Sequence, residues 1–312
     1  MCSSDLNHVE FVGQALSSSI GQEYENLEVI VADDGSSDGT GDVVERFAKD
    51  FPERVLLLPR KPNQGIGGIV DNYNRALMAC RGKYVAFLEG DDVFLPGKVA
   101  KQVEWLEGDE RRVLCGHDVE VFDSVKNKPL YLMSEVCRMR RGRGADLVVR
   151  HNVPFSTVST MVRATAIPTG GFDERLRIVL DWKFWIDCLA SGGHFGYVAG
   201  VLARYRRHRT NITKFHFQTR QDDEFVTLAL VESRYPHLVA SCRYSRARVL
   251  YTSGVGFLRR GERSLARIYL LNALRQSGRP PWKAAVALLL AFMPGRLVAS
   301  TLKRHRRAVA GT

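Results

Sequence analysis

The sequence predicts an α/β fold, in which a parallel sheet carries helices on both faces and a helical region follows. Three apolar runs, "LEVIVA", "RVLLLP" and "KYVAFLE", are too short for helices and are bounded by turn residues, which is typical of buried strands. Segments with helical spacing lie between them, and this alternation indicates a parallel sheet. From about Gln218 onward helices follow one another without strands. We therefore expect one domain over residues 1–217 and a basic helical region over residues 218–312.

Periodicity predicts the remaining elements of the first domain. Asn7 is placed to cap the first helix, and "NQGIGG" turns the chain into the third. "RVLCGHDVEVF" alternates as a half-buried strand does, and "STVSTMVR" is read as another strand. The opening "MCSSDL" shows no strand pattern, so we expect no first strand before Asn7. Helices are expected over residues 9–20, 41–50, 69–80 and 181–191, with another after Pro96.

The 312 residues carry a formal net charge of +11, and the basic excess lies late in the chain. Such an excess favours phosphate-bearing ligands, an anionic membrane face or nucleic acid, or it only forms solvated faces. No basic-aromatic recognition motif is present, which argues against nucleic acid as a partner. The six cysteines are scattered without metal-ligand spacing, which indicates reduced thiols in a cytoplasmic protein. The apolar run Ala284–Met293 is too short to span a membrane, and forms either a core helix or one in a membrane interface.

Carboxylates follow two of the predicted strands. Asp33 and Asp34 come directly after "LEVIVA", and Glu89, Asp91 and Asp92 come directly after the apolar run "YVAFL". Ligands of open parallel sheets collect beyond the carboxyl ends of the strands, so both groups are expected to face one crevice. Carboxylates of this spacing suit a hard divalent cation such as Mg²⁺ or Mn²⁺. The alternative, a solvated acidic turn, is less favoured directly after a buried strand.

Three motifs in order resemble family-two glycosyltransferases with the GT-A-type nucleotide-sugar fold. They are "LEVIVADDGSSDGT", "NQGIGG" followed by "YNRALMACRGKYVAFLEGDDVFLPGKVAKQ", and "GGFDERLRIVLDWKFWIDCLASGG". The resemblance covers residues 7–211, about two thirds of the chain. It implies a Rossmann-like, mixed but mainly parallel sheet flanked by helices, here apparently without the family's usual first strand.

The resemblance also implies roles for matched residues. Asp33 and Asp34 match the acidic pair that contacts the uracil and ribose of the donor. Asp91 matches the family's D-x-D element, which binds metal and diphosphate, with Glu89 as its other arm. Asp181, in "LDWKFW", matches the catalytic base. A carboxylate there can take the proton of an attacking sugar hydroxyl, although the same residue is equally suited to capping the helix it opens.

Three further residues lie near these motifs. His208, in "RYRRHRTN", reaches either the metal or the diphosphate in this resemblance, or is simply solvated. Arg206 is suited to pairing with a phosphate group through two hydrogen bonds. Asp92 either belongs to the nucleotide site or holds its own loop through hydrogen bonds.

We therefore expect an inverting, hexosyltransferase-like enzyme that uses Mn²⁺ or Mg²⁺ and a UDP-sugar, with a carbohydrate or lipid-linked acceptor in cell-surface or secreted glycan synthesis. The "Q-x-x-R-W" signature of processive synthases is absent, which favours addition of a single sugar. The expected location is the cytoplasm, or peripherally the inner face of the membrane. The alternative is a non-catalytic nucleotide-sugar fold that binds a membrane surface or another polyanion. An aspartate phosphatase is disfavoured because the D-x-D-x-T spacing is missing.

Overall fold

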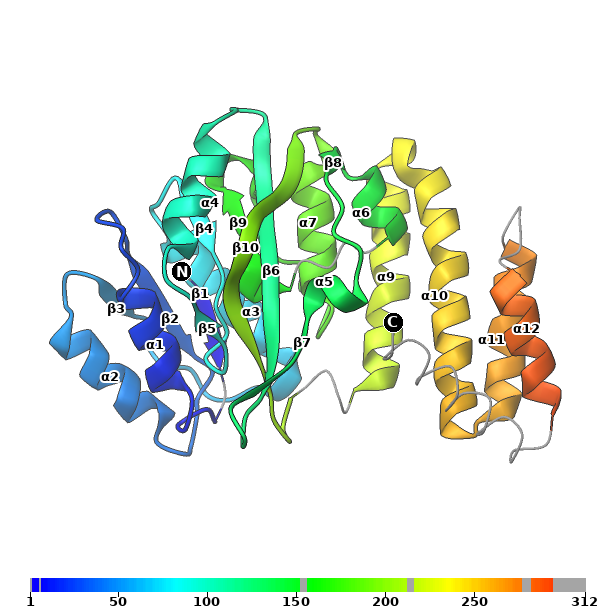
Figure 1. The fold of residues 1–312 in the computed structure, drawn as a ribbon, viewed down its shortest axis with the longest axis horizontal. Helices are drawn as coiled ribbons and strands as arrows, with labels where there is room; N and C mark the ends of the chain where they lie inside the picture. The colour runs from blue at the N-terminus through cyan, green and yellow to red at the C-terminus, as the bar shows by residue number, and fades with distance from the viewer. Residues whose placement is uncertain (1, 6, 152–155, 212–215, 277–281, 294–312) are drawn as a thin grey trace. The chain divides into compact units, whose positions relative to one another are not determined.

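Figure 1 shows the fold as a computed structural model, which describes residues 2–5, 7–151, 156–211, 216–276 and 282–293. The chain divides into two compact units, Met1–Asp223 and Glu224–Thr312. All described strands belong to the first unit. The sequence predicts that strands cease at about Gln218, and helix α9 (Phe217–Arg234) begins there. This helix contains the boundary between the two units, which lies between Asp223 and Glu224. The assignment of residues 1–217 and 218–312 to two domains stays a prediction.

A three-stranded parallel sheet opens the first unit, in the order β1-β2-β3. β1 pairs with β2 from Cys2, opposite Ile30, to Asp5, opposite Asp33. The expectation that no strand precedes Asn7 is therefore wrong. A polar segment joins a sheet through its backbone N–H and C=O groups, and its side-chain pattern does not reveal this. The strands are β1 (Cys2–Asp5), β2 (Val29–Asp33) and β3 (Val55–Leu57).

A seven-stranded mixed sheet follows, in the order β4-β9-β6-β10-β5, with β7 paired to β6 and β8 paired to β10. Its long strands β6 (Arg112–Asp123) and β10 (His194–Arg207) run parallel, and the other described pairs are antiparallel. The mixed sheet is confirmed, with parallel pairing prevailing only in the three-stranded sheet. The remaining strands are β4 (Tyr84–Ala86), β5 (Val93–Phe94), β7 (Lys128–Leu132), β8 (Gly142–Arg143) and β9 (Met161–Arg163).

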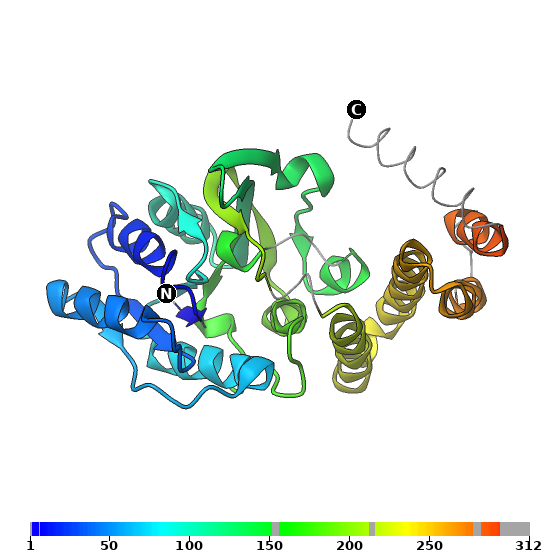
Figure 2. The same cartoon turned by 90° about the horizontal axis from the view of Figure 1, so that it is seen from below.

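Helices flank the strands, as the view from below shows (Figure 2). α3 packs on β1 and β2, α1 packs on β5 and α2, and α4 packs on β6 and β10. The expected helices are present, but α1 begins at Val12 with Phe11 as its N-cap. Asn7 instead lies in the preceding turn. The helical elements before α9 are α1 (Val12–Ile20), α2 (Thr40–Asp50), η1 (Gly65–Gly67), α3 (Ile69–Ala79), α4 (Lys98–Glu107), α5 (Met133–Val136), α6 (Asp146–His151), η2 (Thr157–Ser159), η3 (Ala164–Ala166) and α7 (Leu180–Ala190).

An aromatic cluster lies in the core where β4 ends. Phe172 and Phe184 stack with ring centroids 4.0 Å apart. Phe87, which follows β4, meets Phe184 and Trp185 edge-on at 5.8 and 5.5 Å. These rings are nearly inaccessible to solvent. Because Phe184 and Trp185 belong to α7, this helix and the loop after β4 rest on the same packed core.

The second unit is helical in its described part. α10 and α11 approach closely at Gly254, where a Cβ atom would lie 2.6 Å from Cγ of Leu270. The helices described after α9 are η4 (Pro236–Leu238), α10 (Val239–Arg260), α11 (Arg263–Gln276) and α12 (Trp282–Phe292). A search of the described residues finds no helix with the length and apolar character needed to cross a membrane.

Candidate functional site

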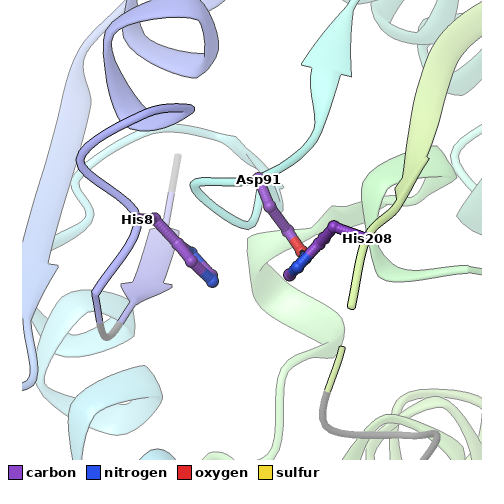
Figure 3. Close-up of side chains that lie close together, drawn as sticks. All are labelled: His8, Asp91 and His208. Carbon is purple, nitrogen blue, oxygen red and sulfur yellow. Dashed lines mark hydrogen bonds and ion pairs between the residues drawn. The ribbon is translucent and has the colours of Figure 1, made fainter. Parts of the chain in front are cut away.

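Three side chains able to bind a metal meet at the ends of different elements of the first unit. His8 lies in the loop between β1 and α1, Asp91 follows β4, and His208 follows β10. One potential ligand atom of each lies within 4.8 Å of the others. Figure 3 shows the side chains converging on one space between these loops. One carboxylate and two imidazoles at this spacing are a suitable donor set for a divalent cation.

Asp91 and His208 are in direct contact. Nε2 of His208 lies 2.8 Å from Oδ2 of Asp91, and Nδ1 of His208 lies 2.8 Å from Oγ1 of Thr210. Nδ2 of Asn211 donates to the same Asp91 oxygen at 3.4 Å. The two ring nitrogens of His208 therefore have fixed partners, which orient the imidazole. The structure brings together two of the residues expected from the sequence, while their role as metal ligands stays a proposal.

His8 is the member of this cluster that the sequence does not reveal. The backbone N–H of His8 donates to Oγ1 of Thr40 at 2.9 Å, and that of Asn7 donates to Oγ of Ser36 at 3.0 Å. These contacts fix the segment after β1 on the loop that follows β2. The ring of His8 then lies edge-on to that of His208, with centroids 5.8 Å apart. Only recognition of β1 as a strand would have placed this histidine at the carboxyl end of the sheet.

Glu89 does not belong to the three-residue cluster. Its Oε1 accepts a hydrogen bond from the hydroxyl of Tyr73 on α3, at 2.9 Å. Among the described residues, the group of side chains able to hold a metal around Asp91 contains His8 and not Glu89. The expectation of Glu89 as the second arm stays a prediction.

Arg206 supports the loop that contains Asp91. Its Nε donates to the backbone carbonyl of Asp91 at 2.6 Å, and its Nη2 donates to Oε1 of Gln14 at 2.5 Å. The guanidinium carbon lies 4.5 Å from the ring centre of Phe11 and 4.7 Å from that of Phe122. The residue is only 6% exposed. A guanidinium held in this way fixes the loop, and the expected bidentate contact of Arg206 with a phosphate stays a prediction.

Asp92 braces the same loop against β10. Its Oδ1 accepts a hydrogen bond from the backbone N–H of Arg206 at 2.8 Å. Its Oδ2 is buried and has no hydrogen-bond partner within the described part of the chain. Burial raises the pKa of Asp92 well above its ordinary value, and the charges of Asp91 and Glu89 add to this effect. Of the two expected roles, the hydrogen bond accounts for the bracing role.

Asp33, at the end of β2, holds the loop that follows it. Its Oδ1 accepts hydrogen bonds from the backbone N–H and the hydroxyl of Ser36, at 3.2 and 2.6 Å. Its Oδ2 lies 2.9 Å from Nε of Arg60. Ser36 in turn accepts the hydrogen bond from Asn7. This chain of contacts connects the end of β2 to the segment that positions His8.

Asp34, like Asp33, is buried at the end of β2. None of the described residues donates a hydrogen bond to it, and it faces Gly68 at the start of α3 closely enough that a Cβ there would lie 3.0 Å from Oδ1. Burial raises the pKa of Asp34 to about 6, and the charges of Asp33 and Asp71 contribute. Above this pH, Asp34 offers an ionised acceptor beside the start of a helix.

Asp181 lies in the first turn of α7. Val179 is the N-cap, so the expectation that Asp181 caps the helix is wrong. Instead Oδ1 of Asp181 accepts from the backbone N–H of Trp182 at 2.7 Å. Burial raises the pKa of Asp181 to about 6. No contact in the described part of the chain joins Asp181 to Asp91, although both elements share the aromatic core.

Asp223 is a second residue that the sequence does not single out, since an acid in the helical stretch "QDDEF" is expected to be solvated. It is almost fully buried. Its Oδ2 accepts hydrogen bonds from the backbone N–H groups of Arg177, Ile178 and Val179, at 3.0, 2.6 and 3.0 Å. These residues lead directly into α7. Asp223 therefore fixes the entry to the helix that carries Asp181.

Two curated relatives match about two thirds of this chain. An uncharacterized protein of Mycobacterium tuberculosis is 30% identical over 216 residues, covering 67% of this chain and 59% of the relative. An uncharacterized glycosyltransferase of Nostoc sp. is 33% identical over 221 residues, covering 67% of this chain and 64% of the relative. The chain thus spans about three fifths of the length of these relatives.

Solved structures share the fold at low sequence identity. Staphylococcus aureus TarS, residues 1–349 in complex with UDP-GlcNAc, aligns with a TM-score of 0.63 and 13% identity, covering 93% of this chain and 84% of TarS. The mannosyltransferase PcManGT of Pyrobaculum calidifontis, in complex with GDP-Man and Mn²⁺, aligns with a TM-score of 0.57 and 18% identity, covering 99% and 84%. The expected GT-A fold is confirmed.

The family model named Glycosyl transferase family 2 matches residues 6–167, more than half of the chain. This range contains the carboxylates at the ends of β2 and β4 and the newly identified His8. The chain belongs to glycosyltransferase family 2.

Proposed function

We propose that this chain transfers a sugar from a nucleoside diphosphate donor, a UDP-sugar, to a hydroxyl group of a carbohydrate or lipid-linked acceptor. One observation carries the proposal. The carboxylates after β2 and the His8, Asp91 and His208 cluster are joined by the segment that Ser36 binds. The residues proposed to contact the nucleoside and the diphosphate therefore lie on one connected set of loops. The complexes of TarS with UDP-GlcNAc and of PcManGT with GDP-Man and Mn²⁺ support this class of donor.

Asp33 and Asp34 are the proposed contacts to the nucleoside. Asp33 already accepts hydrogen bonds from Ser36 and pairs with Arg60, so its carboxylate is held in a fixed position beside the proposed site of the nucleotide base. Asp34 has an available carboxylate that can accept hydrogen bonds from ribose hydroxyls. Because its pKa is about 6, Asp34 is ionised at neutral pH.

The cluster of His8, Asp91 and His208 fits a divalent cation by its chemistry. Two imidazoles and one carboxylate suit Mn²⁺ better than Mg²⁺, which prefers oxygen ligands. A cation bound there would offset the negative charge of the departing nucleoside diphosphate. Within the protein, Arg206 and Asp92 keep the Asp91 loop in place.

Asp181 is the proposed general base. It would accept the proton of the acceptor hydroxyl while the hydroxyl oxygen forms a bond to the anomeric carbon. In the same displacement, the bond between that carbon and the diphosphate oxygen breaks, and the electron pair leaves with the nucleoside diphosphate. A single displacement inverts the configuration of the anomeric carbon. Asp223 would hold the start of α7 so that the base keeps its direction.

The location and pathway are also part of this proposal. Five cysteines are free thiols, which supports a cytoplasmic location; they are Cys80, Cys115, Cys137, Cys188 and Cys242. The proposed pathway is the synthesis of cell-surface or secreted glycans. The alternative of a non-catalytic nucleotide-sugar fold predicts donor binding without transfer. Turnover therefore separates the two hypotheses.

The test is a panel of UDP- and GDP-sugars with Mn²⁺ or Mg²⁺, assayed for release of nucleoside diphosphate with and without sugar acceptors. We expect metal-dependent turnover that Asp91→Asn abolishes. Asp50→Asn, at an exposed position at the end of α2, is the matched control and should retain full turnover. Unchanged turnover in Asp91→Asn, or donor binding without any turnover across the panel, would overturn the proposal.

A further inference from the structure

Helix α12 exposes its large apolar side chains and buries its small ones. Ala284, Ala287 and Ala291 are buried. In contrast, Trp282 is 71% exposed and Leu289 is 68% exposed. A helix that only packs on its own domain shows the opposite arrangement, with large apolar residues on the buried face. The exposed apolar face of α12 is therefore suited to binding a surface outside its own domain.

The exposed side chains form one face of the helix. Val286, Leu289 and Phe292 follow Trp282 at intervals of four, three and three residues, which places them on the same side of the helix. α11, which packs against α12, exposes more apolar side chains at intervals of three residues. The apolar face is defined here by the exposed residues of α12, which are Trp282, Val286, Leu289, Phe292 and Met293.

Basic side chains accompany this apolar face. Arg267 on α11 donates to the backbone carbonyl of Ala291 at 3.0 Å and lies over the ring of Phe292 at 4.2 Å. Lys283 follows Trp282 directly, and its ammonium group lies 5.9 Å from the centre of the Trp282 ring. Aromatic and aliphatic side chains beside Arg and Lys are the composition of helices that lie in a membrane interface.

The net charge of the chain resides in the second unit. Residues 224–312 contain 16 Lys and Arg against three Asp and Glu, whereas residues 1–223 contain 29 against 31. The second unit is therefore +13, and the first is −2. Two copies of this unit would repel each other, so its charge opposes self-association through the apolar face. The same charge attracts an anionic lipid surface.

We propose that the apolar face of α12 docks on an anionic lipid bilayer. Trp282, Leu289 and Phe292 enter the boundary between headgroups and acyl chains, and the basic residues contact lipid phosphates. This binding does not depend on the proposed sugar transfer. It would place the transferase unit at a surface where lipid-linked acceptors reside.

The test uses the full chain with vesicles of phosphatidylcholine alone, or with roughly one third phosphatidylglycerol to supply negative charge. We expect flotation with the anionic vesicles, weakened by salt. The double variant Val286→Gln/Leu289→Gln should bind at least about tenfold more weakly, because it removes apolar surface from the contact. Met78→Gln alters an even more exposed apolar residue of the first unit and should bind as the unaltered chain does.

A second measurement follows Trp282 directly. Lipids brominated on their acyl chains should quench its fluorescence, and Trp282→Phe should remove the quenched component. Equal flotation of the unaltered chain and the double variant would overturn the proposal. So would a dimer, detected by light scattering, that the double variant abolishes, because the face would then belong to a second copy. Neither result bears on the nucleotide-sugar assay, which needs no lipid.

Discussion

Acidification is expected to stop sugar transfer by protonating Asp181. Burial at the start of α7 raises the pKa of this carboxyl to about 6, so about nine tenths of the molecules carry a protonated Asp181 at about pH 5 and about one tenth at about pH 7. A protonated carboxyl cannot accept the proton of the acceptor. The value of kcat/KM for the acceptor should therefore fall about tenfold over this interval.

The assay measures initial rates at saturating donor while the acceptor concentration varies. Saturation matters because Asp34, a proposed donor contact, also has a pKa of about 6, and its protonation would otherwise weaken donor binding in the same range. Asp181→Asn should lower kcat by about 10²- to 10⁴-fold and abolish the acid limb of the profile. The donor Kd should stay constant, since none of the described contacts joins Asp181 to Asp33, Asp34 or Asp91. A flat profile, or a variant that retains more than about a tenth of kcat, would refute the assignment.

His8→Ala should raise the Mn²⁺ concentration for half-maximal turnover about tenfold or more, because it removes one of the three proposed ligands; an unchanged metal titration would exclude His8. Asp223→Asn keeps an acceptor oxygen but removes the charge that binds three N–H groups. It should lower kcat several-fold at constant donor Kd, and an unchanged kcat would show that α7 is held without this charge. Lys98 is fully buried against Gln102, and burial lowers its pKa to about 7. Between about pH 7 and 10 the unfolded chain therefore binds a proton that the folded chain lacks, so the free energy of unfolding rises with pH. Urea titrations should show a rise of about 2 kcal/mol between about pH 7 and 8.5. Lys98→Met should remove this rise, and the same rise in the variant would show that another group causes it.

The carboxylates after β2 and β4 could be placed from the sequence because the strands before them are continuous apolar runs. A strand covered on both faces has no polar alternation, and all five residues of β2 are buried. β1 gives no such signal, since its polar residues join the sheet through backbone pairing with β2. The position of His8 depends on β1, so the polar sequence that hides this strand also hides the place of His8 beside Asp91.

The sequence could not predict that Glu89 and Asp91 have different partners, because both lie in the same short loop. Their partners come from distant elements. Tyr73 of α3 binds Glu89, whereas His208 at the end of β10 contacts Asp91. Arg206 is likewise drawn inward by Gln14 and the rings around it, although its sequence neighbours are basic residues that suggest a solvated stretch. Tertiary packing decides which polar group of a loop is used, and local sequence does not contain that information.

The position of Asp181 is set by two supports that come from different parts of the first unit. Phe184 and Trp185 pack α7 onto Phe87, beneath the Asp91 loop, and a close-packed core does not allow the helix to shift independently of that loop. Asp223 fixes the approach to the helix through three backbone N–H groups. With the helix held in this way, Asp181 is fixed by hydrogen bonds from the backbone N–H groups of Trp182 and of Asp181 itself. In the proposed mechanism, this carboxylate would take the acceptor's proton.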